Sequence, residues 1–244
     1  MSKIFVVGIG PGSYEQMTIK AVESLKKSDV IVGYTVYIDL VKENFPEKLF
    51  LTTPMTQEVK RCKMAFEEAE KGKTVSVICS GDSGVYGMAG LMHEVGVDYP
   101  EVKLEIVPGV SAALGGAAVL GAPLIHDFCV ISLSDLLTPL EKIEQRLKAA
   151  AKADFVVCLY NPSSKKRYDY LQKACDILLK ECKKDTICGV VENIARDGEN
   201  VRIMTLQELR DMQVNMFTTV FIGNSQTKVL NGKMVTPRGY QFEY

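Results

Sequence analysis

The 244-residue sequence lacks an excess of charge of either sign, because 29 Lys and Arg stand against 30 Asp and Glu. A general nucleic-acid-binding protein usually shows a basic excess, so no nucleic-acid partner is expected. No apolar run approaches the roughly 20 residues that cross a bilayer. The opening MSKIFVVGIG also lacks the cleavage pattern of a signal peptide. We therefore expect a cytoplasmic protein that is not attached to a membrane.

The sequence also lacks the spacings typical of metal centres and serine hydrolases. None of the seven cysteines forms a CxxC pair, so a structural zinc or iron–sulfur site is not supported and no protein-bound metal is expected. No G-x-S-x-G motif is present, which leaves serine hydrolysis unsupported. Only two histidines occur, and His126 stands out because Asp127 follows it at a break in the sequence pattern.

What the sequence does have is an alternation of short β-branched runs with helical patterns. Strands are predicted at residues 3–9, 29–34, 74–80, 103–109, 128–134, 154–160, 186–192, 200–204 and 218–224. A helix is predicted over residues 56–73, and Thr-x-x-Glu capping boxes predict helix starts at Thr138 and Thr205. This alternation predicts an α/β protein with mainly parallel sheets. A break at LGAPLIHDF places a boundary between two α/β domains, residues 1–122 and 123–244.

The first predicted strand leads into GIGPG, residues 8–12. The spacing of its glycines differs from the G-x-G-x-x-G of dinucleotide-binding turns, and Pro11 has no N–H to offer a phosphate. Two interpretations remain open. The turn either lets a helix pack on a strand or lets a ligand approach the backbone closely.

Other polar loops follow strands, where α/β proteins bind ligands. SGDSGVYGMAG at residues 80–90 favours contact with a polar ligand, although Asp82 could instead cap a helix. VPGVSAALGG at 107–116 suits either a flat ligand or close helix packing. LYNPSSKKR at 159–167 is either a carboxylate site or a solvated basic loop. ISLSDLLTP at 131–139 and VENIARDGE at 191–199 add further polar groups.

Read together, VGIGPG, SGDSGVYGMAG, VPGVSAA, LGAPLIHDF and VVENIARDGE resemble the S-adenosylmethionine-dependent tetrapyrrole methyltransferases. ISLSDLLTP, LYNPSSKKR, FIGNSQT and TPRGY are similar to the branch that methylates carbon 17 of precorrin-3B or its cobalt counterpart in cobalamin synthesis. The resemblance implies two αβα domains of the tetrapyrrole methylase fold, S-adenosylmethionine in the cleft between them, and a homodimer. It also implies that no iron–sulfur domain follows TPRGY.

The resemblance implies specific site residues. The cofactor contacts are Pro11, Gly81, Asp82, Ser83, Val85, Ser111, Ala112, Tyr160, Asn161 and Ile194. Many relatives have proline in place of Ser83 and methionine in place of Asn161. The substrate contacts are Gly10 and Gly12 in the first turn, with Lys165, Lys166 and Arg167 for its carboxylates.

Methyl transfer from a sulfonium is an in-line displacement, for which the protein mainly supplies proximity and alignment. The carbon-17 branch also implies ring contraction, in which carbon 20 leaves the macrocycle and a lactone forms. That chemistry needs proton transfers. The candidates for them are Tyr34, His126, Asp127, Ser134 and Asp135.

Three alternatives stay open. The chain could methylate a different carbon of a precorrin, methylate a protein side chain, or carry a tetrapyrrole without catalysis. The segments SLSDLLTP and YNPSSKKR argue against methylation at a different ring carbon, and relatives that methylate side chains should lack the second-domain motifs found here. The sequence is compatible with a substrate with or without cobalt.

Overall fold

The computed structural model describes residues 2–164 and 167–241. The chain divides into two compact units, residues 1–112 and 113–244. The division falls before the predicted boundary after residue 122, because helix α5 (Ala112–Leu120) packs on the second sheet. A methyl group on Gly116 of this helix would lie 2.8 Å from the ring of Phe221 in that sheet. The break in the sequence pattern therefore follows the first helix of the second unit.

The first unit is built on a five-stranded sheet in the order β3-β2-β4-β1-β5. Its strands are β1 (Lys3–Gly8), β2 (Val30–Tyr34), β3 (Leu49–Thr53), β4 (Thr74–Cys79) and β5 (Lys103–Val107). All four pairings between these neighbours are parallel, which confirms the predicted parallel sheet for this unit. The edge strand β3 has no counterpart among the predicted strands, because its LFLTT is only partly buried and alternates weakly.

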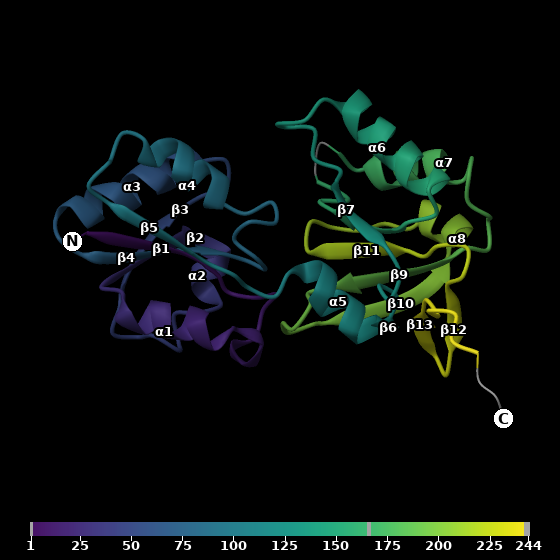
Figure 1. The fold of residues 1–244 in the computed structure, drawn as a ribbon, viewed down its shortest axis with the longest axis horizontal. Helices are drawn as coiled ribbons and strands as arrows, with labels where there is room; N and C mark the ends of the chain where they lie inside the picture. Colours follow the sequence, from purple (N-terminus) through teal and green to yellow (C-terminus); the bar gives the residue numbers. More distant parts are fainter. Residues whose placement is uncertain (1, 165–166, 242–244) are drawn as a thin grey trace. The chain divides into compact units, whose positions relative to one another are not determined.

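Helices cover both faces of this sheet (Figure 1). They are α1 (Ile19–Lys27), α2 (Thr35–Asp39), α3 (Glu58–Glu70) and α4 (Ala89–Gly96), with a 3₁₀ turn η1 at Tyr14–Gln16. Successive residues of β1 point to opposite faces. Val6 packs with Phe66 of α3, whereas Val7 packs with Leu25 of α1. The first unit is therefore an αβα sandwich, as predicted.

The second unit has a five-stranded sheet in the order β10-β9-β11-β8-β7. Its strands are β7 (Phe128–Ser132), β8 (Val156–Tyr160), β9 (Ile187–Glu192), β10 (Asn200–Thr205) and β11 (Thr218–Ile222). Within this five-stranded sheet, β7 and β8 pair in parallel and the other three pairings are antiparallel. The prediction of a mainly parallel sheet is wrong for this unit. Residues 193–199 join β9 to β10, and so short a link cannot make the crossover that a parallel pair needs.

One face of this second sheet is covered by α6 (Leu140–Lys152), α7 (Tyr170–Leu178) and α8 (Leu206–Arg210). Helix α5 covers the other face, beside a small sheet of β12 (Lys228–Leu230), β13 (Lys233–Val235) and β6 (Gly121–Ala122). The second unit thus also has helices on both faces, as predicted. In the described part of the chain, no helix is long and apolar enough to cross a membrane.

The two predicted capping boxes have different outcomes. Thr205 and Glu208 form the predicted box at the start of α8. Helix α6 instead has Pro139 as its N-cap, in an extended conformation and with no side-chain cap hydrogen bond. The helix begins one residue later than predicted, which puts Thr138 outside the capping position.

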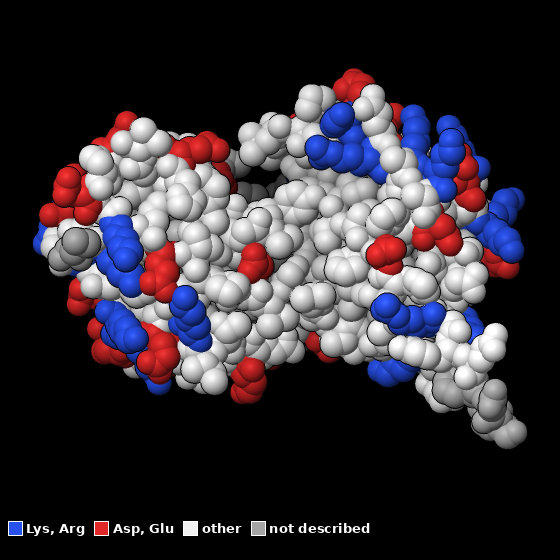
Figure 2. Space-filling model, viewed as in Figure 1, with Lys and Arg blue, Asp and Glu red and all other residues white. Residues whose placement is uncertain are grey.

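The units differ in charge. Residues 1–112 contain 12 Lys and Arg against 15 Asp and Glu, a net charge of −3. Residues 113–244 contain 17 against 15, a net charge of +2. Figure 2 shows basic side chains gathered over the region where Figure 1 draws α6 and α7.

Candidate functional site

Three glycine-containing turns meet at one edge of the first sheet, beyond the carboxyl ends of neighbouring strands β4, β1 and β5. Gly10 and Gly81 exchange two backbone hydrogen bonds, with N–O distances of 3.1 and 2.7 Å. A Cβ on Gly109 would lie 2.2 Å from the carbonyl oxygen of Gly81 and 2.5 Å from that of Gly8. Side chains are excluded here because three backbones pack against one another. The GIGPG turn is therefore, first of all, a packing element.

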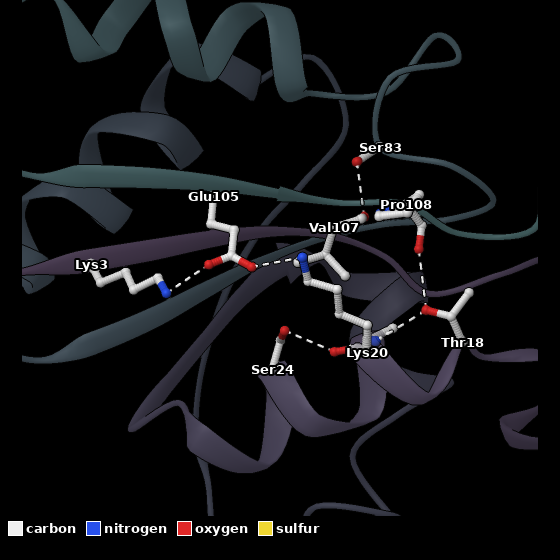
Figure 3. A network of polar contacts seen from close by, with 9 residues as sticks. Lys3, Thr18, Lys20, Ser24, Ser83, Glu105, Val107 and Pro108 are labelled. Atoms are coloured by element: carbon white, nitrogen blue, oxygen red, sulfur yellow. Dashed lines mark hydrogen bonds and ion pairs between the residues drawn. The ribbon is translucent and has the colours of Figure 1, made fainter.

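Asp82 and Ser83 hold two of these turns together. The Asp82 carboxylate accepts hydrogen bonds from the backbone N–H groups of Gly84, Val85 and Gly109, at 2.8, 3.2 and 2.9 Å. Ser83 is fully buried, and its hydroxyl donates to the carbonyl of Val107 at 3.1 Å (Figure 3). Asp82 therefore forms an Asx-type turn that reaches across to the turn after β5, and it does not cap α4.

The three loops at this end of the sheet contain no cationic side chain. Val85 and Tyr86 are exposed, and Tyr86 has a positive φ of 53°. Gly10, Pro11, Gly12 and Ser111 are buried, and Ala112 is half-buried. Residues 8–18, 80–88 and 108–112 include no Lys or Arg. A cationic ligand would meet no like charge from these three loops.

Tyr34 lies at the same edge of the first sheet, at the end of β2. Its ring packs edge-on against that of Tyr37, with the centroids 5.2 Å apart. The side chain is half-buried. Tyr34 is thus held in place beside the strand whose glycine loop contains Asp82.

In the second unit, the loops that follow β7 and β8 are joined to each other. Leu133 N–H donates to the carbonyl of Tyr160 at 2.9 Å. The Ser132 hydroxyl accepts from the backbone of Ser134 at 3.2 Å and from the side-chain amide of Asn161 at 2.9 Å. Asn161 is exposed and has a φ of 53°, a left-handed conformation that asparagine tolerates. These contacts bring the predicted residues Ser134, Tyr160 and Asn161 to one edge of the second sheet.

A second connection between the same loops centres on Asp135. Its carboxylate accepts a hydrogen bond from the Tyr170 hydroxyl at 2.7 Å and lies 3.5 Å from Nη1 of Arg167. The Tyr170 hydrogen bond, helped by Arg167, lowers the pKa of Asp135 although burial opposes this. The same bond raises the pKa of Tyr170. An ionised carboxylate with a lowered pKa is a weak proton acceptor near neutral pH, so this geometry favours a positioning role for Asp135.

His126 and Asp127 lie apart from this cluster. Both are exposed and precede β7, whereas Ser134 and Asp135 follow it. The carbonyl of Asp127 accepts a hydrogen bond from Val156 at the start of β8. Five residues of extended strand span roughly 17 Å, so the structure does not bring these two candidates together with Ser134.

The remaining predicted residues have different surroundings. Ile194 is buried and packs on α5, where its Cδ1 would lie 3.0 Å from a Cβ on Gly116. Lys165 and Lys166 fall outside the described residues. The sequence does not predict Tyr170, because a lone tyrosine at a helix start belongs to no motif. Its contact with Asp135 depends on the pairing of β7 with β8, which the local pattern does not show. No cluster of three His, Cys, Asp or Glu able to hold a metal occurs within residues 2–164 and 167–241.

Comparisons with known proteins show the family and the fold of the chain. Residues 3–210 match the family of Tetrapyrrole (Corrin/Porphyrin) Methylases. The chain is 47% identical to the cobalt-factor III methyltransferase of Priestia megaterium, over 99% of the chain but only 46% of that relative's length. It is 45% identical to the probable cobalt-factor III C(17)-methyltransferase of Salmonella typhimurium, over 96% of the chain and 98% of the relative. The crystal structure of the methyltransferase CobJ superposes with a TM-score of 0.90 at 33% identity, covering 97% of this chain and 100% of CobJ.

Proposed function

The chain belongs to the tetrapyrrole (corrin/porphyrin) methylase family, and on that premise we propose that it methylates carbon 17 of a corrin precursor. S-Adenosylmethionine is the methyl donor, and the acceptor is cobalt-factor III or its metal-free counterpart precorrin-3B. The observation that carries this proposal is the 45% identity to the Salmonella typhimurium relative, which extends over nearly the full length of both chains. The reaction is a step in cobalamin synthesis.

The loops of the first unit fit the proposed cofactor. S-Adenosylmethionine bears a sulfonium cation, and the three glycine-containing turns include no Lys or Arg that would repel it. Asp82 and Ser83 shape these turns through their bonds to Gly109 and Val107. Exposed Val85, with the backbone of Gly84, offers the accessible surface for contact. The individual cofactor contacts in both units remain predictions.

The bound cofactor supplies both the methyl group and its leaving group. What the chain must add is alignment of a nucleophilic ring carbon with that methyl, in surroundings that exclude water. We propose that the loops after β7 and β8 orient the tetrapyrrole, because the Ser132 hydroxyl at the end of β7 accepts hydrogen bonds from both Ser134 and Asn161.

The proposed reaction includes contraction of the macrocycle, which requires proton transfer. Tyr34 lies at the carboxyl end of β2 and Ser134 follows the carboxyl end of β7, whereas His126 and Asp127 precede β7 at its amino end. We therefore rank Tyr34 and Ser134 ahead of His126 and Asp127. Tyr34→Phe and Ser134→Ala should lower turnover, and His126→Ala should leave it near wild type.

Incubation of the pure protein with S-adenosylmethionine and cobalt-factor III, followed by mass spectrometry and absorbance spectroscopy, tests the proposal. One added methyl group with the spectrum of a ring-contracted product supports it. If cobalt-factor III is unchanged, precorrin-3B is the next acceptor. Failure with both acceptors, while the cofactor still binds, contradicts the choice of substrate and leaves the family assignment intact.

We also propose that the protein is a cytoplasmic homodimer without a bound metal of its own. Light scattering coupled to size-exclusion chromatography measures the oligomeric state, and elemental analysis of the purified protein measures its metal content. A monomer, or a stoichiometric metal in the absence of tetrapyrrole, would contradict these two points.

A further inference from the structure

We propose that Tyr170 is a positioning residue which, through Asp135, holds the guanidinium of Arg167 ready for a carboxylate of the tetrapyrrole substrate. The inference rests on the proposed function and adds a residue and a role to it. It also gives Asp135 a different task from the proton transfer predicted for it.

The geometry links three elements at one edge of the second sheet. Tyr170 begins helix α7, Asp135 follows β7, and Arg167 follows β8. The Tyr170 hydroxyl lies 2.7 Å from one oxygen of Asp135, and Arg167 Nη1 lies 3.5 Å from the other. The carboxylate thus stands between the phenol and the guanidinium, in contact with both.

Arg167 has unused hydrogen-bonding capacity. Its side chain is only 14% exposed, and Asp135 is its one ion-pair partner among the described residues. Its Nε is buried and has no hydrogen-bond partner within residues 2–164 and 167–241. A buried N–H without a partner is costly, and such groups usually await a ligand or an ordered water. A guanidinium that contacts one carboxylate through a single nitrogen can still donate two parallel N–H hydrogen bonds to a second carboxylate.

The charges around the pair suit this task. Lys173 is engaged with Asp169 at 2.8 Å, and its Nζ lies 5.1 Å from the centre of the Tyr170 ring. Asp135 therefore has Arg167 as its direct cationic neighbour. The long 3.5 Å contact positions the guanidinium without occupying all of its donors.

Tyr170→Phe is the sharpest test, since it removes only the hydroxyl that bonds Asp135. The matched control is Tyr168→Phe, because Tyr168 lies in the same segment and is 72% exposed. We expect Tyr170→Phe to raise the KM for the tetrapyrrole about tenfold, in line with loss of one hydrogen bond to a charged group. We expect kcat and the KM for S-adenosylmethionine to stay within about twofold of wild type, and Tyr168→Phe to match wild type throughout.

Two further variants separate positioning from other roles. Asp135→Asn should reproduce the KM effect of Tyr170→Phe. Arg167→Lys should restore part of the affinity lost in Arg167→Gln, because lysine keeps the charge but not the fork of donors. Thermal unfolding of each variant checks that it is folded. If Tyr170→Phe does not fold, the KM of Asp135→Asn for the tetrapyrrole tests the proposal instead.

The proposal is overturned if Tyr170→Phe binds and converts the tetrapyrrole as Tyr168→Phe does. It is equally overturned if Asp135→Asn lowers kcat and leaves the KM for the tetrapyrrole unchanged, because that result would indicate that Asp135 transfers a proton. Titration with cobalt-factor III, followed by its absorbance, reads binding without turnover. A wild-type protein that binds cobalt-factor III but methylates neither it nor precorrin-3B contradicts the proposed function, while the affinity difference between Tyr170→Phe and Tyr168→Phe still decides the inference.

Discussion

At the scale of single residues, the glycines of the first unit show that a glycine-rich turn can be required by backbone packing as well as by a ligand. In the sequence, the GIGPG turn is compatible with either a packing turn or a ligand contact. Gly8 turns out to be required by packing, because a Cβ there would lie 2.7 Å from both the Gly109 nitrogen and the Gly81 oxygen. The atoms that crowd it come from turns distant in sequence, so the spacing within GIGPG could not reveal this.

Gly109→Ala should destabilise the protein strongly. The new methyl would overlap the carbonyl oxygens of Gly81 and Gly8, and no flexible side chain is present that could move aside. We expect the free energy of unfolding to fall by about 3 kcal/mol or more. Chemical denaturation measures it.

Gly90→Ala is the matched control for this prediction. Gly90 lies in the first turn of α4 and is exposed, and no atom of the described residues lies within 4 Å of the position that its Cβ would take. Alanine is the better helix former, so stability should be unchanged or rise by up to about 1 kcal/mol. Equal losses in both variants would contradict the packing account.

The site residues were predictable only in part. The sequence pointed to Asp82, Ser134 and Asn161 because each follows a strand of an α/β unit. It could not show that Asp82 bonds to Gly109, nor that Tyr170 meets Asp135, since both contacts join segments far apart in the chain. Contacts of this kind depend on which strands are neighbours, and local patterns do not contain that information.

At the scale of secondary-structure elements, strand positions were easier to predict than strand directions. Apolar alternation located β9, β10 and β11 to within about two residues. The same alternation is compatible with either direction, so the antiparallel pairings were not foreseen. The short link at residues 193–199 was the available signal, because it favours a hairpin over a crossover.

The two Thr-x-x-Glu patterns give a test at this scale. Thr205→Ala removes a formed capping box at α8 and should lower the free energy of unfolding by about 1 kcal/mol. Thr138→Ala should change it by less than about 0.5 kcal/mol, because Thr138 does not cap α6. Urea denaturation of both variants makes the comparison, and a larger effect at Thr138 would contradict the observed helix start.

Glu105 on β5 joins three elements through ion pairs with Lys3 of β1, at 2.6 Å, and Lys20 of α1, at 2.8 Å (Figure 3). The hydrogen bonds from Lys20 and Lys3 lower the pKa of Glu105 to about 2. A glutamate in an unfolded chain has a pKa of about 4.3. Because the folded-state pKa is the lower one, this stabilisation is present above about pH 4.3 and is lost as the pH falls toward 2.

Glu105→Gln should therefore be less stable than wild type at pH 7, by up to about 1 kcal/mol because the site is partly solvated. The difference should shrink as the pH is lowered from 5 toward 3. Denaturation midpoints across this range measure it, with Glu101→Gln as an exposed control that has no ion pair among the described residues. A difference that grows on acidification would have the wrong sign for this account.

At the scale of the whole molecule, the charge of each unit matches the proposed ligands. The first unit, whose three glycine-containing turns lack Lys and Arg, has a net charge of −3. The second unit, which contains Arg167, has a net charge of +2. A cationic cofactor and a polycarboxylate substrate are thus each favoured by one unit. The overall net charge of −1 conceals this division.

Salt should accordingly weaken binding of the tetrapyrrole more than binding of S-adenosylmethionine. Raising the ionic strength from about 0.01 to 0.15 M shortens the screening length from about 30 to 8 Å. We expect the KM for the tetrapyrrole to rise over this range while that for the cofactor changes little. A substrate KM that is insensitive to salt would contradict the use of cationic side chains to hold its carboxylates.

The central claim is the position of methylation. The most direct measurement is NMR of the product formed with S-adenosylmethionine labelled with carbon-13 in its methyl group. The account predicts that the labelled methyl lies on carbon 17 of a ring-contracted macrocycle. A labelled methyl on any other ring carbon would contradict it.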